Sequence, residues 1–290
     1  PPGGGAAAPG GVDAFVLAAG RGDLAAVKQR LLFPRADVDG KGFCGSTALT
    51  AACRSGHFDV VDCLLRAGAS AHVCGRWLYF AKDEPPLKIA ARHGHAAVMQ
   101  RLLQAGADVD QLSGEEDTPA LCDVCRWHGR ADECVAVLLQ AGASVHLGYN
   151  LLSWATSACS VDTVAALADA GARLDAADGD DERPPPLLGA AALVLAEEPD
   201  TPHAVRMLSL LIERGADPNR RSRGRTILSS FEREVRDARR SRRRAPLTPE
   251  GLDGAKQVVA LLERAGAKRD GSCFSRWARP SAGRDARHVL

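Results

Sequence analysis

The sequence predicts an all-α solenoid of about seven helix-turn-helix units joined by hairpin-like loops. The first observation is a Gly-Ala dipeptide that follows a Leu-rich stretch and recurs along the chain, at Gly68, Gly106, Gly142, Gly171, Gly215 and Gly266. The second is composition, because aromatic residues make up only 4% of the 290 residues. A single large core usually takes much of its buried area from Phe, Tyr and Trp. Thin layers of small helices, stacked on one another, fit this sequence better.

The apolar spacing inside one repeat supports two short helices. In residues 47–69, Leu49, Ala52 and Cys53 have the i, i+3, i+4 spacing of one helix face, and a second stripe of this kind covers residues 60–65. A glycine follows each stripe, as expected where a helix ends in a left-handed turn. Such a pair cannot bury both of its apolar sides alone, so stacking of neighbouring pairs is predicted.

The same spacing divides most of the chain into units. We expect residues 13–38 to form a capping first repeat, and the last two units to carry insertions. The long insertion in the last unit covers residues 233–252. The units are predicted at residues 13–38, 39–71, 72–109, 110–145, 146–174, 175–219 and 220–270.

The two ends of the sequence lack this periodicity. Residues 1–12 are rich in Gly, Pro and Ala, and we interpret them as a disordered lead-in. Residues 271–290 are expected to form a C-terminal tail. The sequence begins with Pro1 and has no starting Met, so we expect it to be a piece of a longer chain.

The repeated text resembles the ankyrin repeat, whose pattern runs T-P-L-H-x-A-A-x-x-G-H-x-x-V-V-x-x-L-L-x-x-G-A. Residues 86–107, PLKIAARHGHAAVMQRLLQAGA, match nearly throughout, and residues 47–69 match closely. The resemblance covers about residues 13–270. Lys88 and Thr50 stand where the family has His, so the usual side-chain tie from that His to the turn is not expected. His57 and His95 occupy the Gly-His position of the pattern, where we expect them to cap the turn.

The resemblance also implies a partner-binding surface, because ankyrin repeats bind proteins through hairpin tips and the exposed side of their first helices, which line a concave face. Among the matching positions, Trp127 and Tyr149 have the character of interface hot spots. Trp127 has the alternative of packing under a neighbouring loop. The predicted partner-binding residues are Phe43, Arg54, Lys82, Arg92, His93, Glu116, Asp117, Trp127, His128, Tyr149, Arg223 and Arg225.

A cluster of thiols offers a possible metal site. Cys122, Cys125 and His128 are spaced like a zinc half-site, with Cys134 nearby. However, the three cysteines coincide with apolar positions of the repeat, where Cys acts as a small hydrophobe. We therefore predict buried thiols and no metal ligands. The odd number of cysteines, nine in all, and their irregular spacing indicate a reducing compartment such as the cytoplasm.

No set of residues indicates catalysis. The chain contains neither a Gly-x-Ser-x-Gly nucleophile motif nor a Gly-x-x-x-x-Gly-Lys phosphate loop. We predict a protein with no enzymatic activity, no catalytic residues and no cofactor. A hidden enzyme is the weakest hypothesis, because no motif supplies convergent polar groups.

A basic segment lies near the end of the repeats. Residues 220–244 hold eleven Arg against three acidic residues, a local charge of +8 inside a chain whose net charge is only +1. The run at its end resembles a nuclear-import address, and its alternative is a solvated, flexible insertion. No aromatic residues interleave with the arginines of this run, so nucleic-acid binding by base stacking is not expected. The residues of this run are Arg239, Arg240, Arg242, Arg243 and Arg244.

These observations support one main functional hypothesis and two alternatives. The main one is a non-enzymatic adaptor that binds a peptide or loop of another protein on its concave face. The first alternative is a nuclear or nucleic-acid-associated regulator that acts through residues 220–244, with an import factor bound at residues 239–244. The second is a substrate receptor of a ubiquitin ligase. We expect a cytoplasmic protein with a possible route to the nucleus, and no membrane association.

Overall fold

The fold is taken from a computed structural model of the 290-residue chain. The structure describes residues 11–33, 36–42, 45–76, 83–113, 118–126, 131–147, 151–175, 184–196, 200–240 and 248–270. Most of the predicted lead-in and the whole predicted tail therefore lie outside the described residues.

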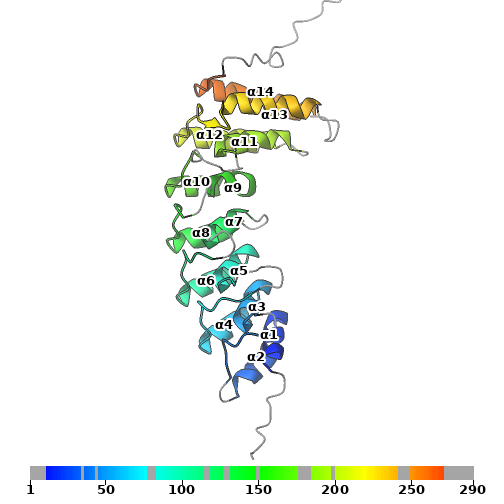
Figure 1. The fold of residues 1–290 in the computed structure, drawn as a ribbon, viewed down its shortest axis with the longest axis vertical. Coiled ribbons are helices and arrows are strands. Elements are labelled where there is room, and N and C mark those ends of the chain that lie inside the picture. Colours follow the sequence, from blue (N-terminus) through cyan, green and yellow to red (C-terminus); the bar gives the residue numbers. More distant parts are fainter. Residues whose placement is uncertain are drawn as a thin grey trace, which may run out of the picture. The chain divides into compact units, whose positions relative to one another are not determined.

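Helices follow one another in pairs along the described chain (Figure 1). The first helices of the pairs are α1 Val12–Arg21, α3 Ala48–Ser55, α5 Pro86–Arg92, α7 Ala120–Arg126, α9 Leu151–Ala158, α11 Pro186–Ala192 and α13 Ile227–Arg240. The second helices are α2 Leu24–Leu31, α4 Phe58–Arg66, α6 Ala96–Gln104, α8 Ala131–Gln140, α10 Val161–Asp169, α12 Thr201–Glu213 and α14 Pro249–Arg264. A short 3-10 helix η1, Leu193–Leu195, and a hairpin of β1 Arg221–Ser222 and β2 Arg225–Thr226 complete the described elements. The prediction of an all-α fold with about seven helix pairs is confirmed.

Contacts divide the chain into two compact units, residues 1–163 with 170–172, and residues 164–169 with 173–290. In the first unit, the first helices α1, α3, α5, α7 and α9 pack on one another in chain order, and α2, α4, α6 and α8 form a second layer. In the second unit, α11 packs on α12 and α13, and α14 packs on α12 and α13. Each layer supplies the cover that a single helix pair lacks.

The buried side chains are those that the apolar spacing selects. Leu49 of α3 and Leu64 of α4 are fully buried, and so are Leu87 of α5 and Leu102 of α6 at corresponding positions. Small residues such as Ala52 fill the remaining space between helices that lie close together. Residues spaced by three or four share one helix face, so a short helix can bury a continuous stripe.

The Gly-Ala dipeptides mark the ends of the second helices, as predicted. Their six glycines all have φ between 81° and 95°, in the left-handed region that L side chains rarely adopt. This conformation reverses the chain after each helix pair.

The two histidines of the Gly-His motif play a different part from the predicted turn cap. His57 and His95 stand at the N-cap positions of α4 and α6, but neither side chain caps its helix. Instead, His57 Nε2 donates to the carbonyl oxygen of Gly20 at 3.2 Å, and His95 Nε2 donates to that of Arg54 at 3.1 Å. Each imidazole thus joins its own repeat to the first helix of the preceding one.

The glycines of the same motif make room for these rings. A Cβ atom at Gly22 would lie 2.7 Å from His57 Nδ1, and one at Gly56 would lie 2.5 Å from His95 Cε1. Such distances are far shorter than any van der Waals contact. The glycine that ends a first helix therefore adopts the left-handed turn and also leaves room for the histidine ring of the next repeat.

The basic insertion predicted at residues 233–252 is partly helical. Helix α13 continues to Arg240, so residues 233–240 extend it and do not form a flexible loop. The reason is the apolar pair Phe231 and Val235, both buried, which lie four residues apart and anchor the helix on its neighbours. Residues 241–247 lie outside the described part of the chain.

Candidate functional site

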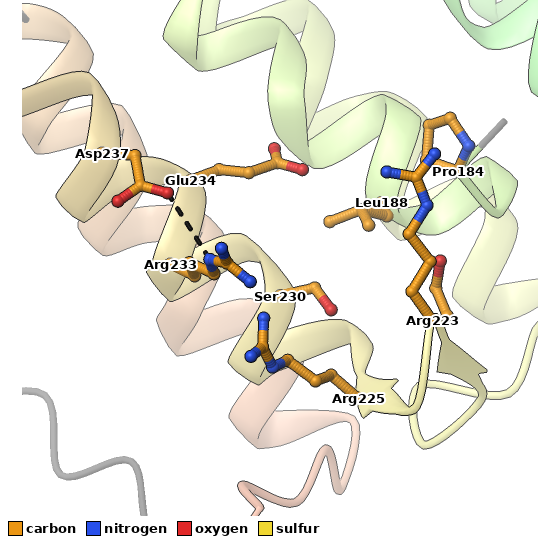
Figure 2. A pocket seen from close by; sticks show the side chains of 9 residues that line it. Pro184, Leu188, Arg223, Arg225, Ser230, Arg233, Glu234 and Asp237 are labelled. Atoms are coloured by element: carbon orange, nitrogen blue, oxygen red, sulfur yellow. Dashed lines mark ion pairs between the residues drawn. The ribbon is translucent and has the colours of Figure 1, made fainter. Parts of the chain in front are cut away.

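The second unit carries a cavity of about 450 Å³ between the start of α11, the β1–β2 hairpin and α13. We name it the hairpin cavity. Figure 2 shows its lining side chains, which come from all three elements. They are Pro184, Leu188, Ser222, Arg223, Arg225, Ser230, Arg233, Glu234 and Asp237. Two apolar side chains thus share the cavity with three arginines and two carboxylates.

The hairpin that forms one wall has a tight two-residue turn. Ser222 pairs with Arg225, and the turn residues Arg223 and Gly224 have φ values of 51° and 77°. Positive φ at both central residues defines the type I′ turn, which matches the twist of two antiparallel strands. An Arg in the left-handed region costs roughly 1–2 kcal/mol relative to its usual conformations. The left-handed backbone conformation of Arg223 therefore lowers the stability of the folded chain slightly.

Hydrogen bonds from the end of the second unit brace this hairpin. Asp270 accepts a bond from the Thr226 backbone N–H at 3.1 Å, and its own N–H donates to Ser229 Oγ at 2.9 Å. The Asp270 carboxylate also lies 3.6 Å from the Arg221 guanidinium. The hairpin is thus held in place by contacts within the second unit.

The charges of the hairpin cavity are only partly paired. Arg233 forms an ion pair with Asp237 at 3.5 Å, and both side chains are exposed. Within the part of the chain that the structure describes, the Arg225 side chain has no hydrogen bond or ion pair. Desolvation raises the pKa of the Glu234 carboxyl, even though much of this residue is exposed, and the charge of Arg223 opposes this rise. An exposed guanidinium with no ion-paired group of its own, such as that of Arg225, can donate hydrogen bonds to an incoming anion.

Arg92, a predicted partner-binding residue, is used inside the first unit. Its guanidinium donates to both oxygens of Glu84, at 2.9 Å and 2.6 Å, and to Asp123 Oδ2 at 2.8 Å. Only 11% of the Arg92 side chain is exposed. Two buried carboxylates, one just before α5 and one on α7, thus hold the side chain that was predicted to face a partner.

Lys88, at the family's His position, is also buried, with 2% of its side chain exposed. Its ammonium group donates to the carbonyl oxygens of Ser113 and Thr118. These two residues pair with each other in an isolated β-bridge. Lys88, standing where the family has His, thus ties α5 to the segment before the next repeat's first helix. Desolvation lowers the pKa of Lys88, while the nearby Asp123 opposes this shift.

Two other predicted residues of the first unit are half-buried. The Arg54 guanidinium lies 3.5 Å from Ser46 Oγ. The His93 ring stacks on that of His95, with 6.2 Å between ring centroids. Burial lowers the pKa of His93, and the charges of His95 and Arg54 act in the same direction.

The remaining predicted partner-binding residues are not placed by the structure. They lie outside the described residues, and they are Phe43, Lys82, Glu116, Asp117, Trp127, His128 and Tyr149. Arg223 and Arg225, in contrast, are both described and exposed. The site that the structure assembles from the predicted residues is therefore the hairpin cavity.

Comparisons with known proteins agree with this repeated architecture. The sequence matches the family described as "Ankyrin repeats (3 copies)" over residues 15–113 and 87–178. These matches span more than half of the chain. The chain belongs to the ankyrin-repeat family.

Among solved structures, the ankyrin-repeat domain of human ASB11 is similar to this chain. The alignment has a TM-score of 0.60 and 24% sequence identity, and it covers 88% of this chain and 99% of that domain. At this identity, the likeness concerns the ankyrin fold alone. The comparison with curated protein sequences gave no match.

The thiol cluster of this ankyrin-repeat protein is buried. Cys122 and Cys125 lie on α7, and Cys134 lies on α8. A hydrogen bond with Cys159, together with burial, raises the pKa of the Cys125 thiol well above its usual value. The described residues contain no group of three or more metal-ligating side chains. His128, the fourth member of the suspected set, is outside them.

The arginines at the end of α13 are exposed. Arg239 and Arg240 occupy the last turn of the helix, where positive charge interacts favourably with the helix dipole. The other three arginines of the predicted import address, at positions 242–244, lie outside the described residues. No helix in the described ranges is long and apolar enough to cross a membrane.

Sequence reasoning missed part of the hairpin cavity. It assigned Arg233 to a flexible insertion, although the buried Phe231 and Val235 on either side already indicate a helix that orients it. Leu188 and Pro184 lie in the predicted unit 175–219 and are not among the predicted partner-binding residues. Their exposure to the cavity depends on the position of the hairpin, which no local pattern specifies.

Proposed function

We propose that this ankyrin-repeat protein is a non-enzymatic adaptor that binds a peptide or loop of a partner protein. Ankyrin repeats generally mediate protein–protein interactions, and the fold is typically an interaction module without enzymatic activity. The observation that carries the proposal here is the exposure of Arg223 and Arg225 on a braced hairpin above an open cavity.

The physical basis is preorganisation. The Asp270 hydrogen bonds fix the hairpin, and buried residues fix α13, so little conformational freedom is lost when a partner binds. Arg is also favoured at interface hot spots, because its guanidinium combines planar hydrogen bonding with apolar contact.

Affinity capture with the full chain tests this proposal. We would compare the wild type with the double variant Arg223→Gly, Arg225→Gln and with the control Arg206→Gln, an exposed arginine in the middle of α12. The expected result is loss of specific partners in the double variant and their retention in the control. Equal retention by all three proteins would place binding elsewhere, and a wild type that captures no specific partner would contradict the adaptor function itself.

Arg92 is unsuitable for such an experiment. Its substitution would expose the two carboxylates that it neutralises and would disturb the packing of α5 on α7. Loss of binding in that variant would therefore report on folding.

A second candidate is the nuclear regulator that acts through the arginine-rich segment. The observation in its favour is that Arg239 and Arg240 are exposed at the end of α13, directly before the remaining arginines of the run. Deletion of residues 233–250 would remove more than half of α13 and the start of α14, so we would instead change Arg239, Arg240 and the three arginines at 242–244 to Gln.

This five-residue variant separates the alternatives. Loss of nuclear location with intact partner capture would identify the run as an import address. If the wild type binds nucleic acid with an affinity that falls steeply with added salt, and the variant does not bind, the run contacts phosphates. The ubiquitin-ligase receptor remains a third proposal, and co-purification of a ligase scaffold with the wild-type chain would test it.

A further inference from the structure

The hairpin cavity has two chemically different walls. Pro184 and Leu188 form an apolar wall at the start of α11, while Arg225 and Arg233 lie on the hairpin and α13 (Figure 2). A ligand that fills this cavity must therefore offer both an apolar group and a group that matches guanidinium.

Charge indicates the sign of that second group. The cavity lining holds three arginines against Glu234 and Asp237. Asp237 already pairs with Arg233 at 3.5 Å, a separation long enough for an incoming carboxylate to compete. The Arg225 side chain forms no hydrogen bond or ion pair with the described residues. One added negative charge would neutralise the cavity, because three positive and two negative side chains line it.

The turn residue Arg223 joins the two walls. Its backbone adopts a φ of 51° that Gly or Asn would adopt with less strain. In this conformation its side chain extends past Leu188 toward Pro184 (Figure 2). The aliphatic part of an arginine can cover an apolar group while its guanidinium stays at the surface. This arrangement suits an apolar ligand side chain enclosed between Leu188 and Arg223.

We propose that the hairpin cavity binds a short acidic–apolar segment of a partner protein. One Asp or Glu side chain of this segment lies between Arg225 and Arg233, and an adjacent apolar side chain packs on Pro184 and Leu188. This inference rests on the adaptor function proposed above and names the class of sequence that the adaptor recognises.

A nucleic acid fits this cavity less well. Glu234 and Asp237 would repel a continuous phosphate backbone, whereas a single carboxylate can bind between the arginines without approaching both of them. The cavity lining contains no aromatic side chain on which a base could stack, and it offers an apolar wall instead.

Labelled synthetic peptides provide the test. Nine-residue Gly-Ser peptides would carry a central Glu-Leu or Leu-Glu pair, and matched peptides would carry Gln in place of Glu or Ser in place of Leu. Binding to the full chain would be measured by fluorescence anisotropy, with a single-stranded DNA of twelve nucleotides as a further probe. We expect one of the two acidic–apolar orders to bind about tenfold more tightly than its Gln and Ser counterparts.

Variants of the chain then locate the binding. Arg225→Gln and Arg233→Gln should each weaken binding of the acidic–apolar peptide about tenfold, while Arg206→Gln should leave it unchanged. Arg223→Gly should weaken binding without loss of thermal stability, because it relieves the positive φ. A folded protein that binds less tightly is thus available for comparison.

Several outcomes would overturn the inference. They are equal affinity for the Glu and Gln peptides, absence of binding by any acidic–apolar peptide, wild-type affinity in both Arg225→Gln and Arg233→Gln, and tighter binding of the DNA than of the peptides. Partner capture with the same variants distinguishes this failure from failure of the adaptor function. If the peptides fail but the wild type still captures a specific partner, only the assignment to this cavity is wrong.

Discussion

Arg92 of α5 and Asp123 of α7 form an ion pair of 2.8 Å between two successive repeats. Glu84, which precedes α5, completes the group by accepting two hydrogen bonds from the same guanidinium. All three side chains are almost fully enclosed. In a buried group of this kind, loss of one member leaves uncompensated charge on the others.

We therefore expect Arg92→Ala to lower the free energy of unfolding by about 3–5 kcal/mol. The control is Arg66→Ala, which removes the ion pair with Asp62 from a largely exposed side chain and should cost less than about 1 kcal/mol. Urea denaturation followed by circular dichroism would compare the two. A similar small loss in both variants would show that the buried group contributes little.

The contact between Gly56 and His95 predicts a specific coupling. Gly56→Ala should destabilise the protein by more than about 1 kcal/mol, because the new methyl group meets the His95 ring in addition to the strain of its φ of 76°. Gly106→Ala is the matched control, since its φ is 88° but nothing lies within 4 Å of the added Cβ.

The double variant Gly56→Ala, His95→Ala separates the two contributions. Removal of the ring should make the effect of Gly56→Ala resemble that of Gly106→Ala, with a coupling energy of about 0.5–3 kcal/mol in a double-mutant cycle. Purely additive losses in thermal denaturation would argue against the steric contact.

His93 gives the stability a dependence on pH. Its pKa in the folded chain lies below the ordinary value of 6.5, chiefly because of burial. The unfolded chain then binds more protons than the folded chain between these two pKa values, so stability falls as the pH drops through this interval. Below the folded pKa the loss is complete, and above 6.5 it is absent.

The measurement is the melting temperature of the wild type and of His93→Gln between pH 8 and pH 5. The difference between the two proteins should change across this range, with the wild type losing more stability in acid. Parallel curves would mean that His93 is protonated equally well in the folded and unfolded chains.

Arg269 and Glu232 form an ion pair with a buried carboxylate in the second unit, which tests the same effect as the Arg92 group. Glu232 is fully buried on α13, and Arg269 donates to it at 2.9 Å. Arg269→Ala should destabilise the protein by about 3 kcal/mol, because it leaves a buried carboxylate without this cation. Glu232→Gln in the same chain should restore part of the loss.

Glu263→Ala serves as the control, because it removes the more exposed carboxylate partner of Arg269 and leaves Glu232 paired. We expect a cost below about 1 kcal/mol for it. If thermal denaturation gave the two single variants equal losses, the burial of Glu232 would not be the source of the effect.

The sequence was sufficient to predict the repeats, because their determinants are local. Leu49 and Leu64 are selected by helical spacing, and Gly68 by the need for a left-handed turn. The partners of Arg92 could not be predicted in this way, since Asp123 is one repeat away and charged residues on short helices are usually solvated.

The candidate site was predictable only in part. Arg223 and Arg225 were identified from their place in a hairpin, and the structure exposes both. The contribution of Arg233 depends on the length of α13, which the arginine-rich composition concealed. The apolar wall formed by Leu188 required knowledge of which element lies opposite the hairpin.

The His95 ring packs against Gly56 in the same way as the His57 ring packs against Gly22. Because the two contacts are alike, one segment between them can be removed and the remaining contact re-formed. Excision of residues 57–94 would join Gly56 directly to His95, and the imidazole of His95 would then come to lie beside Gly22. Arg54, which occupies the same place in its repeat as Arg92, would face Asp123. A gene could therefore gain or lose a whole segment of this kind while the remaining neighbours still recognise each other. A cut that did not begin after one such glycine and end before the next such histidine would disturb the contact at its junction.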